Sequence, residues 1–163
     1  MLMPSARLPL PAQAGSLRRT RSVVGETAAF VLDSFALLAF LQKEAGGPVV
    51  QGLLTRAQTG DCSTFLSLIN LGEVLYIIER EQSLVAAQRT LSAVEQLPLQ
   101  IEPISRTTVL AAAHLKAHYP IAYADAFAIV AARERAAVLV TGDPEFEPVA
   151  KAGIVQVQWL PGR

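Results

Sequence analysis

The residues best suited to chemistry in this sequence are its acids, above all its few aspartates. The 14 acidic residues comprise ten glutamates and only four aspartates, Asp33, Asp61, Asp125 and Asp143. Asp33 ends the apolar run 29–32, and Asp143 closely follows the apolar run 137–141. Short apolar runs of this kind are typical of buried parallel strands. Ligands bind at the carboxyl ends of parallel strands where the strand order reverses, so both aspartates are expected at such an edge.

Two further acids are predicted to reach the same edge of the sheet. Asp125 opens a predicted helix, 124–135, and the connection before that helix must return to this edge. Glu73 lies one turn into the helix that follows a second predicted strand, 64–68. Taken singly, these acids also fit ordinary roles as helix caps, turn residues or solvated side chains. Taken together, Asp33, Glu73, Asp125 and Asp143 are predicted to line one cleft.

A cluster of carboxylates makes chemical sense mainly with a hard divalent cation. Without one, neighbouring carboxylates repel and raise one another's pKa. Oxygen ligands favour Mg²⁺ or Mn²⁺ over softer metals. Such an ion binds phosphate oxygens and lowers the pKa of a bound water, so the reaction class predicted is metal-assisted hydrolysis of phosphodiesters.

The elements that must position these acids alternate along the chain. Apolar runs at 29–32, 64–68, 99–104, 137–141 and 154–159 predict strands, the fourth of them central and the last at an edge. Helices are predicted at 34–44, in the stretch that follows up to residue 58, and from about residue 71. The helix from residue 71 has a core face, formed by Leu71, Val74, Leu75 and Ile78. Three more helices are predicted at 82–96, 107–118 and 124–135. This order predicts an α/β fold around a mostly parallel sheet of four to five strands.

Composition sets further bounds. Hydrophobic residues make up 52% and charged residues 17%, which excludes disorder of the main body. Residues 1–27 carry four arginines and one glutamate and are predicted to be a flexible basic tail of net charge +3, so the domain at 28–163 carries −3 of a neutral total. No apolar stretch is long enough to span a membrane. With Cys62 the single cysteine, a reducing cytoplasm is the expected location.

Four segments resemble the PIN-domain nucleases, and within them the VapC-type toxins of bacterial toxin–antitoxin pairs. The likeness extends from about Val31 to Trp159 in order and spacing. Its segments are Val31-Leu32-Asp33-Ser34 with Ala36-Leu37-Leu38-Ala39, Asn70-Leu71-Gly72-Glu73-Val74-Leu75-Tyr76, Tyr123-Ala124-Asp125-Ala126-Phe127, and Leu139-Val140-Thr141-Gly142-Asp143-Pro144-Glu145-Phe146.

The resemblance implies a three-layer α/β/α fold and endoribonuclease activity that leaves a 5′-phosphate and a 3′-hydroxyl. It implies that Asp33, Glu73, Asp125 and Asp143 bind Mg²⁺ or Mn²⁺ and position water. It assigns supporting roles behind the metal ligands to Ser34 and Thr141. The partners that it implies are an RNA substrate, a VapB-like antitoxin and a second copy of the chain in a homodimer.

Other functions remain open at this point. An aspartate after the first strand also marks haloacid-dehalogenase-like phosphatases and receiver domains. The phosphatases need a second aspartate where Phe35 stands, and the lysines do not fit the receiver pattern. A PIN-like module that binds proteins without catalysis is the main alternative. His114 and His118 have the spacing of a zinc pair but no third ligand nearby. The basic side chains that could contact RNA phosphates at the rim of the cleft, or simply form a solvated face, are Arg133, Arg135, Arg80 and Lys43.

Overall fold

The core of the protein is a sheet of five parallel strands. The computed structural model describes residues 27–162. The strands are β1 (Ala28–Leu32), β2 (Cys62–Ser67), β3 (Gln100–Glu102), β4 (Val138–Thr141) and β5 (Val157–Trp159). All four neighbouring pairs are parallel, in the order β3-β2-β1-β4-β5. The chain builds outward from β1 first on one side and then on the other, so the strand order reverses between β1 and β4.

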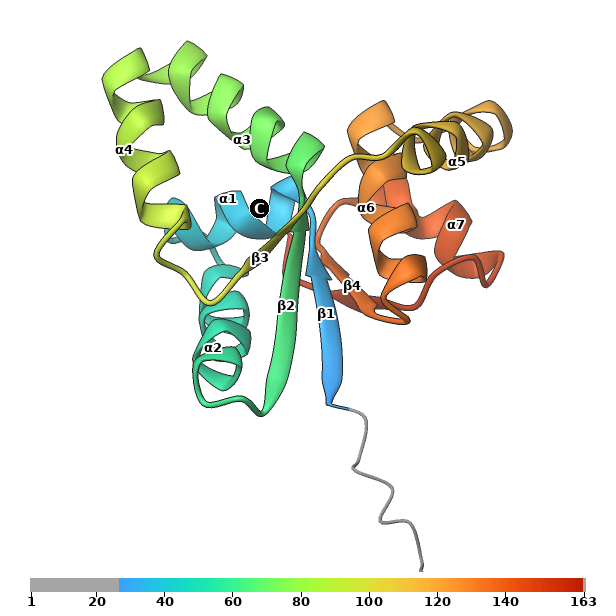
Figure 1. Cartoon of the computed structure of the whole chain (residues 1–163), viewed down its shortest axis with the longest axis horizontal. Coiled ribbons are helices and arrows are strands. Elements are labelled where there is room, and N and C mark those ends of the chain that lie inside the picture. The colour runs from blue at the N-terminus through green and yellow to red at the C-terminus, as the bar shows by residue number, and fades with distance from the viewer. Residues whose placement is uncertain (1–26, 163) are drawn as a thin grey trace, which may run out of the picture.

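Helices cover both faces of this sheet. They are α1 (Ser34–Leu41), α2 (Gly47–Gln58), α3 (Leu68–Glu81), α4 (Leu84–Val94), α5 (Arg106–His118), α6 (Tyr123–Glu134), the short 3₁₀ helix η1 (Pro144–Phe146) and α7 (Glu147–Lys151). Figure 1 shows α1 to α4 on one side of the strands and α5 to α7 on the other. Each side has its own cluster of buried apolar side chains. The predicted three-layer α/β/α fold is therefore confirmed, with β4 inside the sheet and β5 at its edge.

Several predicted boundaries differ from the structure. Helix α1 ends at Leu41 rather than at residue 44, because Lys43 adopts a left-handed backbone with φ of 58°. The last strand begins at Val157 rather than at residue 154, because the N–H of Ile154 bonds the carbonyl of Val149 and ends α7. Helices η1 and α7 had not been predicted; two prolines, at 144 and 148, each occupy a first-turn position that suits proline.

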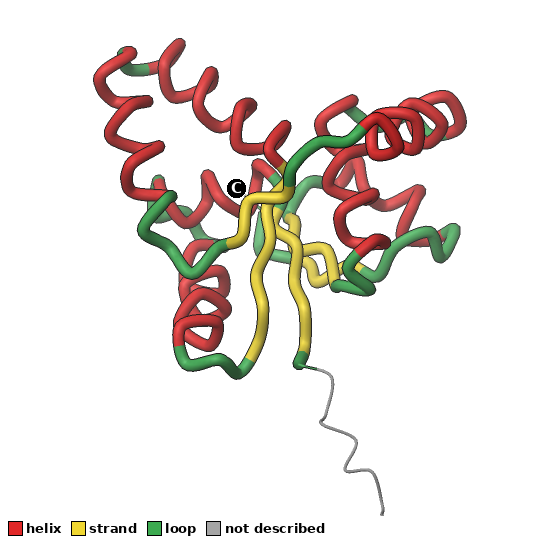
Figure 2. Tube along the Cα trace, in the orientation of Figure 1, coloured by secondary structure: helices red, strands yellow, loops and turns green. Residues whose placement is uncertain are grey.

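Helices α1 and α3 both begin at the same end of the sheet. The tube in Figure 2 shows β1 and β2 running side by side towards the end from which α1 and α3 depart. The predicted basic tail lies outside the described residues, apart from Thr27. No helix among residues 27–162 is long and apolar enough to cross a membrane.

Candidate active site

A pocket of about 220 Å³ opens where α1, α3, α6 and the loop after β4 meet. The four acids predicted to converge all line it: Asp33, Glu73, Asp125 and Asp143. Ser34 also faces this pocket, whereas Thr141 lies fully buried behind it. The remaining lining residues are Phe35, Leu38, Ile77, Ala122 and Glu145. Segments more than 100 residues apart in the sequence thus supply one concave site.

Asp33 is the most firmly held of the acids. It is 1% exposed and caps the N-terminus of α1, with its Oδ1 accepting a hydrogen bond from the Ala36 N–H at 2.7 Å. Its Oδ2 accepts a hydrogen bond from the Thr141 hydroxyl at 2.5 Å. The same hydroxyl accepts the N–H of Asp143 at 3.0 Å. Thr141 therefore ties the loop after β4 to the carboxylate after β1.

Glu73 is tied to the same side of the pocket through Ser34. The Ser34 hydroxyl lies 2.5 Å from Glu73 Oε2 and 3.3 Å from the main-chain oxygen of Asn70. Ser34 is 7% exposed and begins α1, while Glu73 is half-buried on α3. We call Asp33, Ser34, Glu73 and Thr141 the hydrogen-bonded set, because each pairs with a side chain from another element.

Asp125, Asp143 and Glu145 form a contrasting group that we call the acidic set. Asp125, in the first turn of α6, is 7% exposed. Asp143 caps η1 by accepting the N–H of Glu145 at 2.9 Å. Within residues 27–162, none of these three carboxylates hydrogen-bonds a side chain of another element. All three line the pocket, where the charges of Asp143 and Glu145 raise the pKa of Asp125.

The pKa values of the two most buried acids reflect their burial first and the neighbouring charges second. Burial raises the pKa of Asp33 to about 7, against the hydrogen bonds from Thr141 and Ala36, and the charges of Asp125 and Asp143 add to the rise. Burial also raises the pKa of Asp125 to about 7, and the charges of Asp143, Glu73 and Glu145 follow as further causes. A divalent cation in the pocket would reverse both effects by favouring the ionised carboxylates.

A glycine lets the loop after β4 come close to α1. A Cβ added at Gly142 would lie 2.4 Å from Cε1 of Phe35, well inside van der Waals contact. The loop between Thr141 and Asp143 therefore packs directly against the Phe35 ring, which itself lines the pocket. A side chain at position 142 would have to displace the Phe35 ring.

Two residues at the site had not been assigned roles from the sequence. Glu145 lines the pocket and acts on the pKa of Asp125, yet its exposed position after Pro144 carried no periodic signal. Asn70, fully buried on α3, donates a hydrogen bond to Ser34 Oγ at 3.1 Å. Asn70 is the only asparagine of the chain, a feature of the sequence that could have drawn attention to it.

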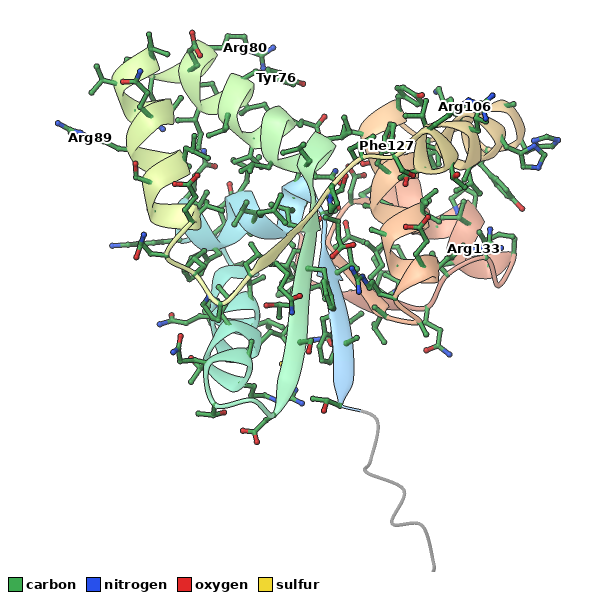
Figure 3. The ribbon with its side chains drawn as sticks, viewed as in Figure 1. Tyr76, Arg80, Arg89, Arg106, Phe127 and Arg133 are labelled. Carbon is green, nitrogen blue, oxygen red and sulfur yellow. The ribbon has the colours of Figure 1, made fainter. Side chains whose placement is uncertain are left out.

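The candidate phosphate contacts do not line the pocket. Arg133 belongs to the last turn of α6, whereas Asp125 belongs to the first, and Figure 3 shows Arg133 at the far end of that helix. Arg135 pairs with Glu102 at 2.8 Å and lies over the Phe65 ring. Neither arginine lines the pocket, and a contact of either one with RNA phosphate stays a prediction. Figure 3 shows Arg80 beside Tyr76 on the outer part of α3, where its guanidinium carbon lies 5.8 Å from the ring centroid.

The donor set of the pocket fits a hard divalent cation. All five carboxylates offer oxygen ligands, which suit Mg²⁺ or Mn²⁺. Within residues 27–162, no three His, Cys, Asp or Glu side chains are gathered closely enough to form a ready-made coordination group. Mg²⁺ usually keeps several waters and uses one or two carboxylates, so the donors present remain compatible with it.

Comparison with known proteins identifies the family. Residues 30–152 match the profile of the PIN domain. The chain belongs to the PIN-domain family. The resemblance seen in the sequence is thereby confirmed over most of the chain. No curated protein matches the sequence.

Solved structures share the fold of this PIN domain. VapBC2 from Rickettsia felis, bound to a DNA fragment from its promoter, superposes with a TM-score of 0.63 at 16% identity, covering 82% of this chain and 99% of that chain. VapC20 from Mycobacterium tuberculosis, a toxin that cleaves the sarcin–ricin loop, gives a TM-score of 0.59 at 16% identity, covering 79% and 98%. VapBC-5 from Mycobacterium tuberculosis gives 0.55 at 19% identity, covering 82% and 99%. At such identities the likeness is one of fold.

Proposed function

We propose that this PIN domain is a metal-dependent endoribonuclease, a VapC-type toxin that hydrolyses RNA phosphodiesters with Mg²⁺ or Mn²⁺. The observation that carries the proposal is the convergence of Asp33, Glu73, Asp125 and Asp143 on one pocket at the strand-order reversal. Asp33 and Asp143 cap helices, but capping alone does not explain why four acids from four segments meet at one pocket, because like charges repel. The fold shared with VapC proteins, one of them described as cleaving an RNA loop, supports the same reaction.

Each residue then has a role that follows from its surroundings. Asp33, Glu73, Asp125 and Asp143 would hold the cation, which when bound supplies a more acidic water and charge stabilisation for the phosphate. Thr141 keeps the Asp33 carboxylate in place, and Ser34 does the same for Glu73. Asp125 lies among other acids, where a bound cation would keep its carboxylate ionised.

The test is RNA cleavage by the purified chain with and without Mg²⁺. We expect cleavage that stops in chelator, with products bearing a 5′-phosphate and a 3′-hydroxyl. Asp33→Asn and Asp143→Asn should each lower the rate at least about 100-fold, because even residues behind a metal ligand cost 10- to 100-fold. Asp61→Asn is the matched control: Asp61 is exposed, bonds Thr59 and lies outside the pocket. Unchanged cleavage in both site variants would refute the proposal.

The alternative is a PIN-like module that binds proteins without catalysis. The two readings differ in whether the pocket binds a divalent cation. Calorimetric titration with Mn²⁺ should show binding that is weakened in Asp125→Asn and retained in Asp61→Asn. Absence of any Mn²⁺ binding by the folded wild-type chain would favour the alternative.

We also propose an antitoxin partner and a homodimer. Several solved structures with this fold are of VapBC, which supports a VapB-like partner. In Figure 1, α3 and α4 project from the rest of the molecule, and these two helices leave large apolar side chains exposed: Leu68, Ile69, Tyr76, Leu84 and Val85. Such a surface suits a protein partner.

Light scattering tests for the dimer, and a short upstream reading frame whose product suppresses RNA cleavage would identify the antitoxin. RNA as substrate would place this function in the cytoplasm.

A further inference from the structure

The strongest unexplained feature near the pocket is the side chain of Asn70. It lies in the first turn of α3, one turn before Glu73, and it is 0% exposed. A buried amide destabilises a fold unless its donors and acceptor are paired. The two donors and the acceptor of Asn70 differ in this respect.

The donors of Asn70 connect two other helices to α3. The side-chain nitrogen lies 3.1 Å from Ser34 Oγ and 3.3 Å from the carbonyl oxygen of Ala124. A carbonyl oxygen can only accept, so the amide must present its nitrogen, not its oxygen, towards Ala124. Ser34 opens α1 and Ala124 precedes Asp125 in α6. One side chain therefore links the starts of three helices.

The contact with Ser34 also fixes the direction of a second hydrogen bond. A serine hydroxyl has one hydrogen, and here the Asn70 N–H occupies one acceptor position of Ser34 Oγ. The nearest acceptor for the hydroxyl hydrogen is Glu73 Oε2 at 2.5 Å. The bonds therefore run in one direction, from Asn70 to Ser34 to Glu73.

The acceptor of Asn70 has no such partner. Asn70 Oδ1 is the one buried side-chain nitrogen or oxygen within residues 27–162 that lacks a hydrogen-bond partner. An unpaired buried acceptor lowers stability, so an apolar side chain of similar size would be the better choice for packing alone. What the amide provides is its pair of donors.

We propose that Asn70 is a positioning residue that sets the placement of Glu73 and Asp125 in the pocket. Through Ser34 Oγ it holds the Glu73 carboxylate, and through the Ala124 carbonyl it holds the turn that carries Asp125. Asn70 itself does not line the pocket. This inference rests on the proposed metal-dependent function, and it assigns the relative placement of two metal ligands to one amide.

The experiment compares Asn70→Leu with the wild-type chain in Mn²⁺ titration calorimetry, thermal unfolding and RNA cleavage. Leucine has a similar size but no donors, so we expect a melting temperature close to or above that of the wild type. The Mn²⁺ affinity should fall about tenfold or more, as for residues that orient metal ligands. The loss in cleavage should be in kcat, with the KM for RNA little changed.

Two further variants complete the test. Thr108→Val removes another buried hydroxyl, which lies on α5 and pairs with Ser105 just before that helix, and it should leave the Mn²⁺ affinity unchanged. Ser34→Ala removes the middle of the connection to Glu73 and should weaken Mn²⁺ binding. Adding it to Asn70→Leu should cost less than the sum of the two single effects. If Asn70→Leu does not fold, Ser34→Ala alone decides.

The outcomes separate this inference from the proposed function. A wild-type chain that binds no Mn²⁺ refutes the function. If the wild-type chain binds Mn²⁺ and folded Asn70→Leu binds it equally tightly, the positioning role alone is overturned. Where the leucine variant does not fold, an unchanged Mn²⁺ affinity in Ser34→Ala overturns it. A lower melting temperature without a change in Mn²⁺ affinity also overturns it, because Asn70 would then serve only the fold.

Discussion

The two sides of the pocket hold their carboxylates by different means. In the hydrogen-bonded set, Asp33 and Glu73 accept bonds from Thr141 and Ser34, which belong to other elements. In the acidic set, Asp125, Asp143 and Glu145 face one another with no side-chain partner recorded among the described residues. The first side is ordered by the fold itself. The second side carries charge repulsion that the proposed cation would relieve.

The largest expected difference is in stability without metal. In chelator at pH 8, Asp125→Asn should stabilise the protein, by up to a few kcal/mol because each pKa unit corresponds to about 1.4 kcal/mol. Asp33→Asn should stabilise it less, because both Asp33 oxygens accept hydrogen bonds and an amide can replace only one of them. Thermal or urea unfolding measures both changes, with Asp61→Asn as control. An equal increase in the free energy of unfolding in the two variants would show that the hydrogen bonds to Asp33 make no difference between the sets.

The sign of the pH dependence sharpens the same comparison. A carboxyl whose pKa is raised from 3.8 to about 7 on folding contributes stability at low pH that is lost as the pH rises from about 4 through about 7. The advantage of Asp125→Asn should therefore be largest at pH 8 and shrink towards pH 5. An advantage that grows on acidification would contradict the raised pKa.

A smaller effect is expected from breaking the hydrogen-bonded set. Thr141→Val removes the donor to Asp33 and should lower the free energy of unfolding by about 2 kcal/mol, as for hydrogen bonds to charged groups. The pKa of Asp33, followed by NMR, should rise further. The matched control is Thr59→Val, which removes an exposed threonine–aspartate bond of 2.6 Å to Asp61 and should cost little. Similar losses in both variants would show that burial of the pair is irrelevant.

The smallest expected effect tests the packing of the loop that joins the two sets. Gly142→Ala places a methyl group against Phe35 and should lower the free energy of unfolding by about 1 kcal/mol or more. Gly52→Ala, in α2 with nothing within 4 Å, should instead raise it by up to about 1 kcal/mol. Denaturant unfolding of both variants provides the measurement. A neutral result at Gly142 would mean that the loop or the Phe35 ring moves aside without loss of stability.

The sequence predicts those site residues that lie next to a buried strand, and it does not predict those in irregular segments. Asp33 could be placed because an apolar run ends directly at it, and Asp143 because it follows the clearest strand. Glu145 could not, since an exposed residue in a short 3₁₀ turn belongs to no periodic pattern. The end of α1 was misplaced because a left-handed lysine such as Lys43 leaves no trace in hydrophobic spacing.

Asn70 illustrates a further limit of the sequence. The motif around it was recognised, but its contacts depend on Ser34 and Ala124, which are 36 and 54 residues away. Spacing along α3 alone cannot reveal a side chain whose partners lie on two other helices. The fold class, by contrast, follows from the alternation of elements, because each buried strand and amphipathic helix has its own local period.

The bond between Thr141 and Asp33 spans 108 residues, and this separation governs when the pocket can exist. A ribosome releases β1, β2 and the helices between them long before β4 emerges, since synthesis proceeds from the N-terminus. The pairing of β1 with β4 is therefore among the last contacts to form. A partly synthesised chain therefore has no complete pocket until β4 and the loop after it have joined β1.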